Sequence, residues 1–175
     1  MKRIILTGAQ GTGKSTVLNH FKENGWNCIT EVVRNLAKEG VKINELGDEE
    51  GQTRIFNAYY DLLSKKESYI SDRGLTDVMA YTIYLNNEMG VNLNALALEQ
   101  MIDFQYFSMQ NEDIIYCYFP IEFPVVDDGV RSVNEEFRSI VDGTIKSILD
   151  LSGIKYYTIS GTVEERIKQL EEIMA

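Results

Sequence analysis

The stretch Gly8-Ala9-Gln10-Gly11-Thr12-Gly13-Lys14-Ser15 fills every fixed position of the phosphate-binding pattern Gly-x-x-x-x-Gly-Lys-Ser/Thr. An apolar run at residues 3–7 precedes it and is short enough for a buried strand. Apolar residues at helical spacing follow it, at Val17, Leu18 and Phe21. The stretch therefore joins a strand to a helix, which is the setting in which this pattern cradles phosphate groups.

The residue types in this loop have clear chemical reasons. Glycines at 8, 11 and 13 let backbone N–H groups turn inward around phosphate oxygens without side-chain clashes. Lys14 is expected to reach the β- and γ-phosphates as a positive charge, and the Ser15 hydroxyl to ligate Mg²⁺. We therefore expect the chain to bind a nucleoside triphosphate with Mg²⁺. The residues expected to contact the nucleotide here are Gly8, Gly11, Thr12, Gly13, Lys14, Ser15 and Thr16.

Composition indicates one domain over residues 1–175. Apolar residues make up 44% of the chain and charged residues 25%, as in ordinary globular proteins, and the length is enough for a real core. The net charge of −10 disfavours general binding to a nucleic-acid backbone, although a local basic groove stays open as an alternative. No apolar run approaches transmembrane length, and the N-terminus lacks the pattern of a signal peptide.

The two cysteines, Cys28 and Cys117, lie in apolar, strand-like runs. Cysteine in such places usually behaves as a small apolar core residue, so we expect free thiols in a reducing compartment. A cytoplasmic setting follows, in a cell or in a virus-infected host. The lone His20 lies on the first expected helix, where a surface or packing role is favoured over catalysis.

Short apolar runs alternate with stretches of helical periodicity along the whole chain. The expected strands are residues 3–7, 26–30, 68–72, 114–119 and 156–159. This alternation predicts an α/β domain in which helices cover both faces of a parallel sheet. In addition, Thr162-x-x-Glu165 predicts a capping box for the last helix. A homodimer is a further expectation. Tyr59, Tyr60 and the apolar helix beginning at Leu75 would then lie either in the dimer interface or in the core of the single chain.

Polar side chains follow the second, third and fourth expected strands. Because ligands of such sheets bind outside the carboxyl ends of the strands, these side chains are candidates for a site. Asp72 is expected to hold Mg²⁺, or otherwise to cap the next helix. Glu31 is expected to orient or deprotonate an acceptor hydroxyl, or otherwise to be an exposed acid in a first helical turn.

Arginines at these strand ends have alternative roles. Arg73 either meets the phosphoryl group or an acceptor phosphate, or pairs with Glu31 or Asp77. Arg34 either holds an acceptor phosphate or pairs with Glu31. Arg131 is expected to lie on a lid of about residues 121–138 that contacts the phosphates, with Arg138 as a weaker candidate.

Three further positions are candidates for contacts with the two substrates. Gln52 lies in the first turns of its helix and is expected to face the cleft. Gly161 and Thr162 follow the fifth expected strand. They are expected either to pass under an adenine ring or to form a plain strand-to-helix turn.

These residues resemble the P-loop nucleoside and nucleotide kinases. Within that group, the segments Thr30-Glu31-Val32-Val33-Arg34 and residues 160–166 look most like AAA-type ATP-binding domains related to ribosylnicotinamide kinase, many of them from bacteriophages. The resemblance implies a three-layer P-loop NTPase fold with strand order 2-3-1-4-5 and a small lid. It also implies ATP with Mg²⁺, a catalytic Glu31, an Asp72-Arg73 pair serving metal and phosphates, and an adenine contact at Gly161.

The sequence departs from related patterns at two places. Thymidylate-kinase-like proteins have Arg-Glu-Pro after the second strand, where this chain has Thr30-Glu31-Val32. Nucleoside kinases often have Ser after the acid–Arg pair, where this chain has Gly74. Both departures leave the acceptor undetermined.

We therefore expect a phosphotransferase that moves the γ-phosphate of ATP to a hydroxyl or phosphate of a nucleoside, nucleotide or related small molecule. One alternative is a kinase of nucleic acid, acting on a 5′-hydroxyl end or a hydroxymethylated base, which requires a basic channel near Arg34, Arg54 and Arg73. A second alternative is a nucleotide-dependent switch ATPase, which needs no pocket beside Glu31.

Overall fold

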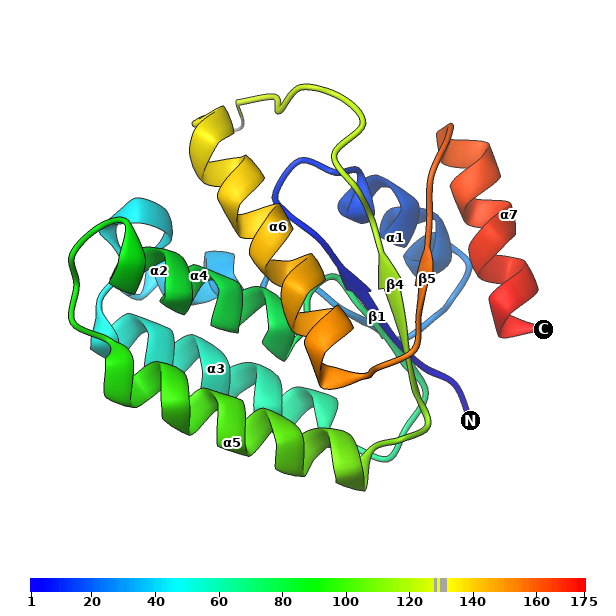
Figure 1. The fold of residues 1–175 in the computed structure, drawn as a ribbon. Helices are drawn as coiled ribbons and strands as arrows, with labels where there is room; N and C mark the ends of the chain where they lie inside the picture. Colours follow the sequence, from blue (N-terminus) through cyan, green and yellow to red (C-terminus); the bar gives the residue numbers. More distant parts are fainter. Residues whose placement is uncertain (128, 130–131) are drawn as a thin grey trace.

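The computed structural model of the chain describes all residues except 128, 130 and 131. Its centre is a parallel five-stranded sheet of order β2-β3-β1-β4-β5 (Figure 1), which confirms the expected fold class and strand order. The strands are β1 Arg3–Thr7, β2 Cys28–Ile29, β3 Tyr69–Ser71, β4 Ile114–Tyr118 and β5 Tyr156–Thr158. The helices are α1 Lys14–Glu23, α2 Val32–Lys38, η1 Asn44–Leu46 (a 3₁₀ turn), α3 Glu49–Leu63, α4 Leu75–Asn87, α5 Asn94–Gln110, α6 Glu135–Ser152 and α7 Val163–Met174.

The central strand β1 sends alternate side chains to the two faces of the sheet, as the pleat requires. Ile4 and Leu6 pack with apolar residues of α1 and α7 on one face. Ile5 packs with residues of α3, α4 and α6 on the other face. The sheet is thus the middle of three layers, and all five residues of β1 are buried, so the strand reads as a continuous apolar run apart from its ends.

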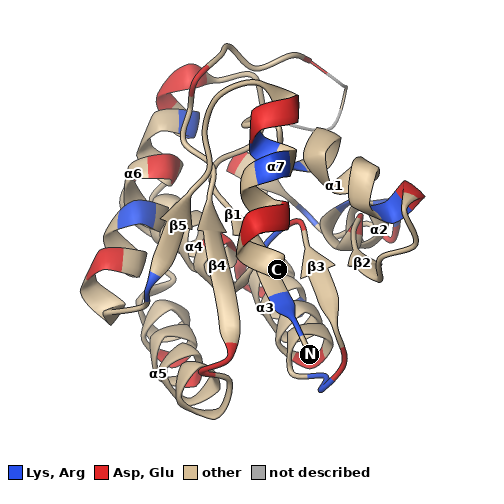
Figure 2. Cartoon of the chain, turned by 90° about the vertical axis from the view of Figure 1, so that its right-hand side faces the viewer, with Lys and Arg blue, Asp and Glu red and all other residues tan. Residues whose placement is uncertain are grey.

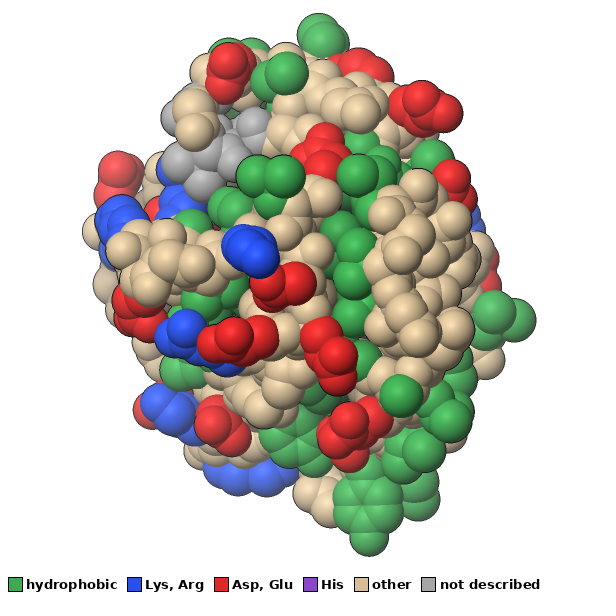
Figure 3. Space-filling model, turned by 90° about the vertical axis from the view of Figure 1, so that its left-hand side faces the viewer, with side chains coloured by type: hydrophobic (Ala, Val, Ile, Leu, Met, Phe, Trp, Pro, Cys, Tyr) green, Lys and Arg blue, Asp and Glu red, His purple; other side chains and the backbone are tan. Residues whose placement is uncertain are grey.

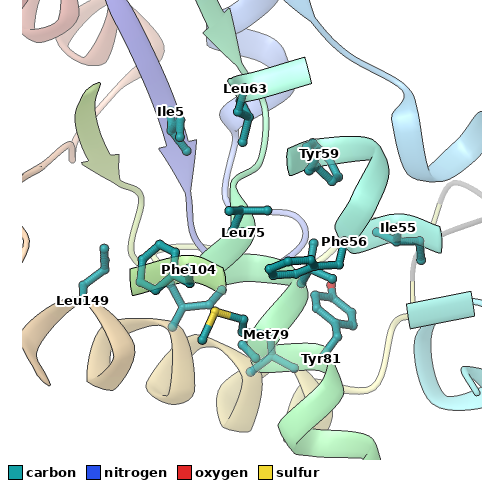
Figure 4. Packing of buried hydrophobic residues seen from close by; sticks show 14 of the residues in the cluster. Ile5, Ile55, Phe56, Tyr59, Leu63, Leu75, Met79, Tyr81, Phe104 and Leu149 are labelled. Carbon is teal, nitrogen blue, oxygen red and sulfur yellow. The ribbon is translucent and has the colours of Figure 1, made fainter. Parts of the chain in front are cut away.

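The larger core lies between the sheet and the helices α3, α4 and α6. Figure 4 shows Leu75 and Met79 of α4 among Phe56 of α3, Phe104 of α5 and Leu149 of α6. Helix α4 is almost completely buried, as its nearly all-round apolar sequence predicts. Helix α5 forms an outer layer that contacts α3 and α4 (Figure 1).

The edge strand β2 is shorter than expected. Only Cys28 and Ile29 pair with β3, whereas the sequence pattern predicted a strand over residues 26–30. Trp26 instead packs edge-to-face against Phe21 of α1, so burial of its ring and not sheet pairing accounts for its apolar character. Both cysteines are free, Cys117 buried and Cys28 half-buried, as expected.

The connection between β4 and α6 also corrects an expectation. The lid was predicted over about residues 121–138, but α6 begins at Glu135, capped by the Asn134 side chain. Arg138 therefore belongs to the first turn of a packed helix and is fully buried, not carried on a lid. The described residues of 120–134 form neither helix nor strand, and Arg131 lies outside the described residues.

The residues expected to be either interface or core are core. Tyr59 is 1% exposed, Leu75 is fully buried, and Tyr60 is half-buried against the Phe107 ring. Among the described residues, no helix combines the length and apolarity needed to span a membrane.

A buried arginine at the first position of β1 ties the amino end of the sheet together. The Arg3 guanidinium is fully buried, and it donates to Asn111 Oδ1 at 2.8 Å and to both carboxylate oxygens of Asp113. The hydrogen bonds from Arg3 hold the pKa of the Asp113 carboxyl below its ordinary value. A lowered carboxyl pKa means that this pairing stabilises the fold above the ordinary pKa and is lost as the pH falls through the lowered one.

We predict that Asp113→Ala lowers the free energy of unfolding by about 1–3 kcal/mol at pH 7, because it leaves buried donors of Arg3 without their acceptor. Urea unfolding at several pH values measures this. The difference from the native chain should shrink as the pH falls below the lowered pKa of Asp113. Glu112→Ala, at the exposed neighbouring position, is the control and should change little. Equal stability of the two variants at pH 7 would contradict the role given to Arg3.

Candidate active site

The phosphate-binding loop has the backbone that its glycines predicted. Gly8, Gly11 and Gly13 have φ values of 137°, 68° and 87°, a region that side chains rarely tolerate. At Gly8 a side chain would in addition overlap the carbonyl group of Phe119, just after β4. The glycines thus serve two purposes here, since they permit the turn and let the loop lie directly against the sheet.

Two buried arginines hold the loop from outside through its carbonyl groups. Arg138 of α6 donates from Nε to the Gln10 carbonyl at 2.9 Å and from Nη2 to the Gly11 carbonyl at 3.0 Å. Arg166 of α7 donates to the Thr12 carbonyl at 2.6 Å. Both arginine side chains are at most 2% exposed. Because three successive carbonyls are held on the outside, the intervening peptide planes are fixed in orientation.

Two carboxylates hold the first residues of the loop through their N–H groups. Asp77 of α4 accepts from the Gly8 amide at 3.3 Å, and Asp142 of α6 accepts from the Ala9 amide at 3.3 Å. The Asp77 carboxylate is fully buried and also accepts from the Gly74 amide, so it caps its own helix while it contacts the loop. The loop is therefore held by side chains from both neighbouring helices as well as by its own glycines.

Lys14 lies inside the loop. Its Nζ donates to the carbonyls of Gly8 and Ala9 at 2.6 and 2.7 Å and to Thr12 Oγ1 at 3.1 Å. Burial, aided by the Arg73 charge, lowers the pKa of Lys14 to about 7. An anionic phosphate in the loop would favour the ammonium form, because an opposite charge nearby offsets the cost of burial.

Glu31 and Asp72 meet at the carboxyl ends of β2 and β3. Glu31 has φ 63°, a left-handed conformation that is strained for a residue other than glycine. The Asp72 carboxylate accepts a hydrogen bond from the Glu31 backbone. Burial raises the pKa of Asp72, while the nearby charges of Arg73 and Lys14 oppose that rise. The strained backbone of Glu31 is thus tied to the acid expected to serve the metal.

A cavity of about 140 Å³ brings most of the predicted residues together. Its lining includes the phosphate loop from Gln10 to Thr16 together with Glu31, Arg34, Asp72 and Arg73. A second cavity of about 40 Å³ adjoins it and contains Gln52, which is 2% exposed and accepts a hydrogen bond from Thr82 Oγ1 at 3.1 Å. Arg73 lines both cavities, so they are two parts of one site.

The structure also answers which groups the candidate arginines contact. Arg34 Nε lies 3.3 Å from the Glu31 carboxylate, which is the pairing alternative of the sequence analysis. Arg73 instead donates to Tyr81 Oη at 3.4 Å and stacks over the Tyr81 ring at 5.5 Å. Arg73 is thereby oriented by a tyrosine beside the cavity.

Gly161 and Thr162 do not line the cavities described. The Gly161 amide donates to Glu122, and its carbonyl accepts from Arg166 Nε at 2.8 Å. Thr162 caps α7 in the predicted capping box with Glu165. Their turn is connected to the phosphate loop through Arg166, which contacts Thr12 with its other nitrogen. The adenine contact stays a prediction.

The donor set fits a nucleotide-bound Mg²⁺ better than a protein-enclosed metal. Among the described residues, no group of three or more His, Cys, Asp or Glu side chains is arranged to hold a metal. Ser15 is exposed at the cavity, and Asp72 also lines it. Mg²⁺ commonly keeps few protein ligands and takes phosphate oxygens and water for the rest. These two oxygen donors fit that pattern.

Several residues that build the site were missed by the sequence analysis. Asp77, Tyr81, Asp142 and Arg166 all act on the loop or on Arg73. Asp77 was considered only as a partner of Arg73, Arg166 only as part of the segment 160–166, and the other two not at all. Asp77 carried a usable signal, because a single charge within an almost wholly apolar helix needs a buried partner. The other three lie in ordinary amphipathic or apolar contexts, which gave no such signal.

Comparisons with known proteins agree with this geometry. The sequence model of a family described as an AAA domain matches residues 3–166. A search of curated proteins gave no match to this sequence. Among solved structures, deoxyadenosine kinase from M. mycoides with products dCMP and dCDP is 16% identical, with a TM-score of 0.69 over 98% of this chain and 97% of that one.

Two further solved structures are similar. The NadR protein in complex with NR is 16% identical with a TM-score of 0.70, over 98% of this chain and 50% of that chain. Thymidylate kinase from Candida albicans is 16% identical with a TM-score of 0.67, over 99% of this chain and 90% of that one. At these identities the likeness shows a shared fold.

We predict that Arg138→Ala weakens the binding of ATP about 10- to 100-fold, because charged hydrogen bonds worth about 1.5–3 kcal/mol no longer orient the loop. Isothermal titration calorimetry measures the affinity. Arg54→Ala is the matched control, since Arg54 is exposed and pairs with Glu39 on the surface. ATP affinity within twofold of the native value in Arg138→Ala would contradict the role of this arginine.

Proposed function

The chain belongs to this AAA-domain family, and we propose that it is an ATP- and Mg²⁺-dependent phosphotransferase acting on a nucleoside, nucleotide or related small molecule. The observation that carries the proposal is the position of Glu31. Its backbone is held in a strained conformation, and it lines the same cavity as Lys14 and Ser15 of the phosphate loop. A carboxylate in the same cavity as a phosphate site is suited to receive the proton of an acceptor hydroxyl.

The chain's own residues divide the work of phosphoryl transfer. ATP supplies the phosphoryl group, and Mg²⁺ neutralises charge on its phosphates. The loop amides and Lys14 hold the phosphates, while Ser15 and Asp72 are placed for the metal. Arg73, oriented by Tyr81, presents a positive charge where the phosphoryl group passes to the acceptor. Glu31 orients the acceptor hydroxyl and takes its proton.

The second cavity supports a small acceptor with one flat polar part. Its walls include the apolar side chains of Val33, Ile55 and Val78, with the Gln52 amide among them. Apolar walls beside the polar side chains of Gln52, Asn44 and Asp77 suit a nucleobase, which presents apolar faces and hydrogen-bonding edges. The similar structures named above include kinases of a deoxynucleoside and of thymidylate, in agreement with this class of acceptor.

A nucleic-acid kinase is less well supported. The basic channel that this alternative needs would lie near Arg34, Arg54 and Arg73. Two of these three have carboxylate partners, since Arg34 pairs with Glu31 and Arg54 with Glu39. Figure 2 shows Lys and Arg interspersed with Asp and Glu along the helices of the face in view. A switch ATPase needs no acceptor space, and the cavity beside Glu31 argues against it.

We predict that Glu31→Gln lowers the rate of phosphoryl transfer about 10²- to 10⁴-fold, the usual contribution of a general base, and leaves ATP affinity nearly unchanged. Single-turnover transfer and calorimetric titration with ATP measure the two effects. Glu39→Gln makes the same chemical change at the C-terminal end of the same helix and should leave transfer intact. Full activity of Glu31→Gln would exclude Glu31 as the base.

We predict that Lys14→Ala abolishes ATP turnover, because the loop loses its only buried ammonium and with it the charge that meets the phosphates. ATP consumption by the native chain and by the variant measures this. The same assay of the native chain with nucleosides, deoxynucleosides, nucleotides, ribosylnicotinamide or hydroxymethylated DNA identifies the acceptor. Turnover stimulated by a nucleoside or nucleotide supports the proposal. Stimulation by DNA alone, or turnover unaffected by every acceptor, would favour the alternatives.

A further inference from the structure

Helix α5 carries apolar side chains on its outer face. Leu98, Met101, Ile102, Tyr106 and Met109 are 60%, 48%, 59%, 63% and 74% exposed. Their spacing of three and four residues places them along one side of the helix, and we call them the α5 stripe. Figure 3 shows hydrophobic atoms gathered at the lower right of that view, over the α5 side of the molecule.

The opposite face of α5 is apolar as well. Leu96, Phe104 and Phe107 are buried against the rest of the molecule. Over its 17 residues the helix has no Lys or Arg, and its two acids, Glu99 and Asp103, flank the stripe. A helix that is apolar all round is normally covered on all sides. In the single chain α5 is covered on one side only.

The exposed area is close to what a stable dimer needs. The five side chains of the stripe, exposed by 48–74% of about 200 Å² each, present roughly 600 Å² of mostly apolar surface. The largest apolar patch of a typical monomer is about 300–600 Å², and a standard interface buries about 800 Å² per partner. With the exposed neighbours Ala95 and Gln105, the α5 face approaches the area of one half of such an interface.

The stripe also matches a copy of itself. Between Leu98 and Met109, the exposed uncharged positions of the helix are 98, 101, 102, 105, 106 and 109, with intervals of three, one, three, one and three residues. This series is unchanged when the helix direction is reversed. A two-fold axis near residues 103 and 104 therefore sets Leu98 opposite Met109 and Met101 opposite Tyr106, which is the self-complementarity that a symmetric dimer requires.

Charge favours this face over the rest of the surface for self-association. Two copies with a net charge of −10 each repel one another wherever their acidic surfaces meet. The side chains of the α5 stripe are themselves uncharged, with the exposed Glu99 at the edge of the stripe, and antiparallel packing also sets opposite ends of the helix dipoles side by side. We propose that the chain forms a two-fold symmetric homodimer through antiparallel packing of α5 against α5 of a second copy.

This dimer leaves the nucleotide site accessible. Helix α5 lies outside α3 and α4, whereas the phosphate loop lies between β1 and α1 at the carboxyl end of the sheet (Figure 1). None of the stripe residues lines either cavity of the site. The inference is therefore independent of the proposed function, and changes to the stripe test one without the other.

Sedimentation equilibrium over protein concentrations on the order of 1–100 μM tests the dimer. The native chain should have twice the monomer mass at the upper end, and Ile102→Glu should have the monomer mass, because it puts a like charge pair at the centre of the interface. Leu151→Glu is the matched control, since Leu151 is 89% exposed outside the stripe, and should stay dimeric. A monomeric native chain, or a dimer that survives Ile102→Glu, overturns the proposal.

Cross-linking gives a second measurement that does not depend on the stability of Ile102→Glu. In the antiparallel arrangement the two copies of residue 105 lie on the order of 10 Å apart, from the helix rise and usual interhelical distances. Gln105→Cys should therefore form a covalent dimer with a short bis-maleimide, and Leu151→Cys should not. Absence of cross-linking at Gln105→Cys, or equal cross-linking of both variants, overturns this pairing. ATP affinity should be unchanged in all four variants.

Discussion

The site depends on buried charged side chains that hold the phosphate loop by its backbone. Arg138 and Arg166 take the carbonyls of residues 10–12, and Asp77 and Asp142 take the amides of residues 8 and 9. A loop of glycines is flexible by itself, and ordering it on binding would cost conformational entropy. Side chains of α4, α6 and α7 order the loop when the chain folds. Binding of an anion therefore requires little further loss of conformational entropy.

The same kind of pairing explains why the core tolerates buried charge. Arg3, Arg138 and Arg166 are among the largest fully buried side chains, and each is satisfied by carbonyl or carboxylate oxygens. Without those partners an unpaired guanidinium in the core would be strongly destabilising. Two of them serve the loop and the third ties the opposite end of the sheet. Core packing and site geometry are thus parts of one structure.

The other half of the site lies at the strand ends, where Glu31 has a strained backbone conformation. Glu31 adopts a left-handed backbone at the end of a two-residue edge strand, and its backbone is held by the Asp72 carboxylate. Such a conformation persists only where neighbouring groups enforce it, and it is typical of functional positions. Helix α5 has apolar side chains on both faces, and none of its residues lines the two cavities of the site. The role proposed for this helix is therefore association with a second copy and not catalysis.

The sequence by itself determined the phosphate loop, the alternation of strands and helices, and the strand ends where Glu31, Asp72 and Arg73 lie. These features could be predicted because hydrophobic periodicity and the glycine pattern depend only on residues that are close in the sequence. The sequence could not assign Arg138 to a buried place behind the loop, nor find Arg166 and Asp142. Their hydrogen bonds join residues more than 120 positions apart, and nothing local distinguishes a buried arginine on a helix from a solvated one. Only the tertiary structure decided which of these charges meet the loop, since burial and partner choice depend on how the helices pack.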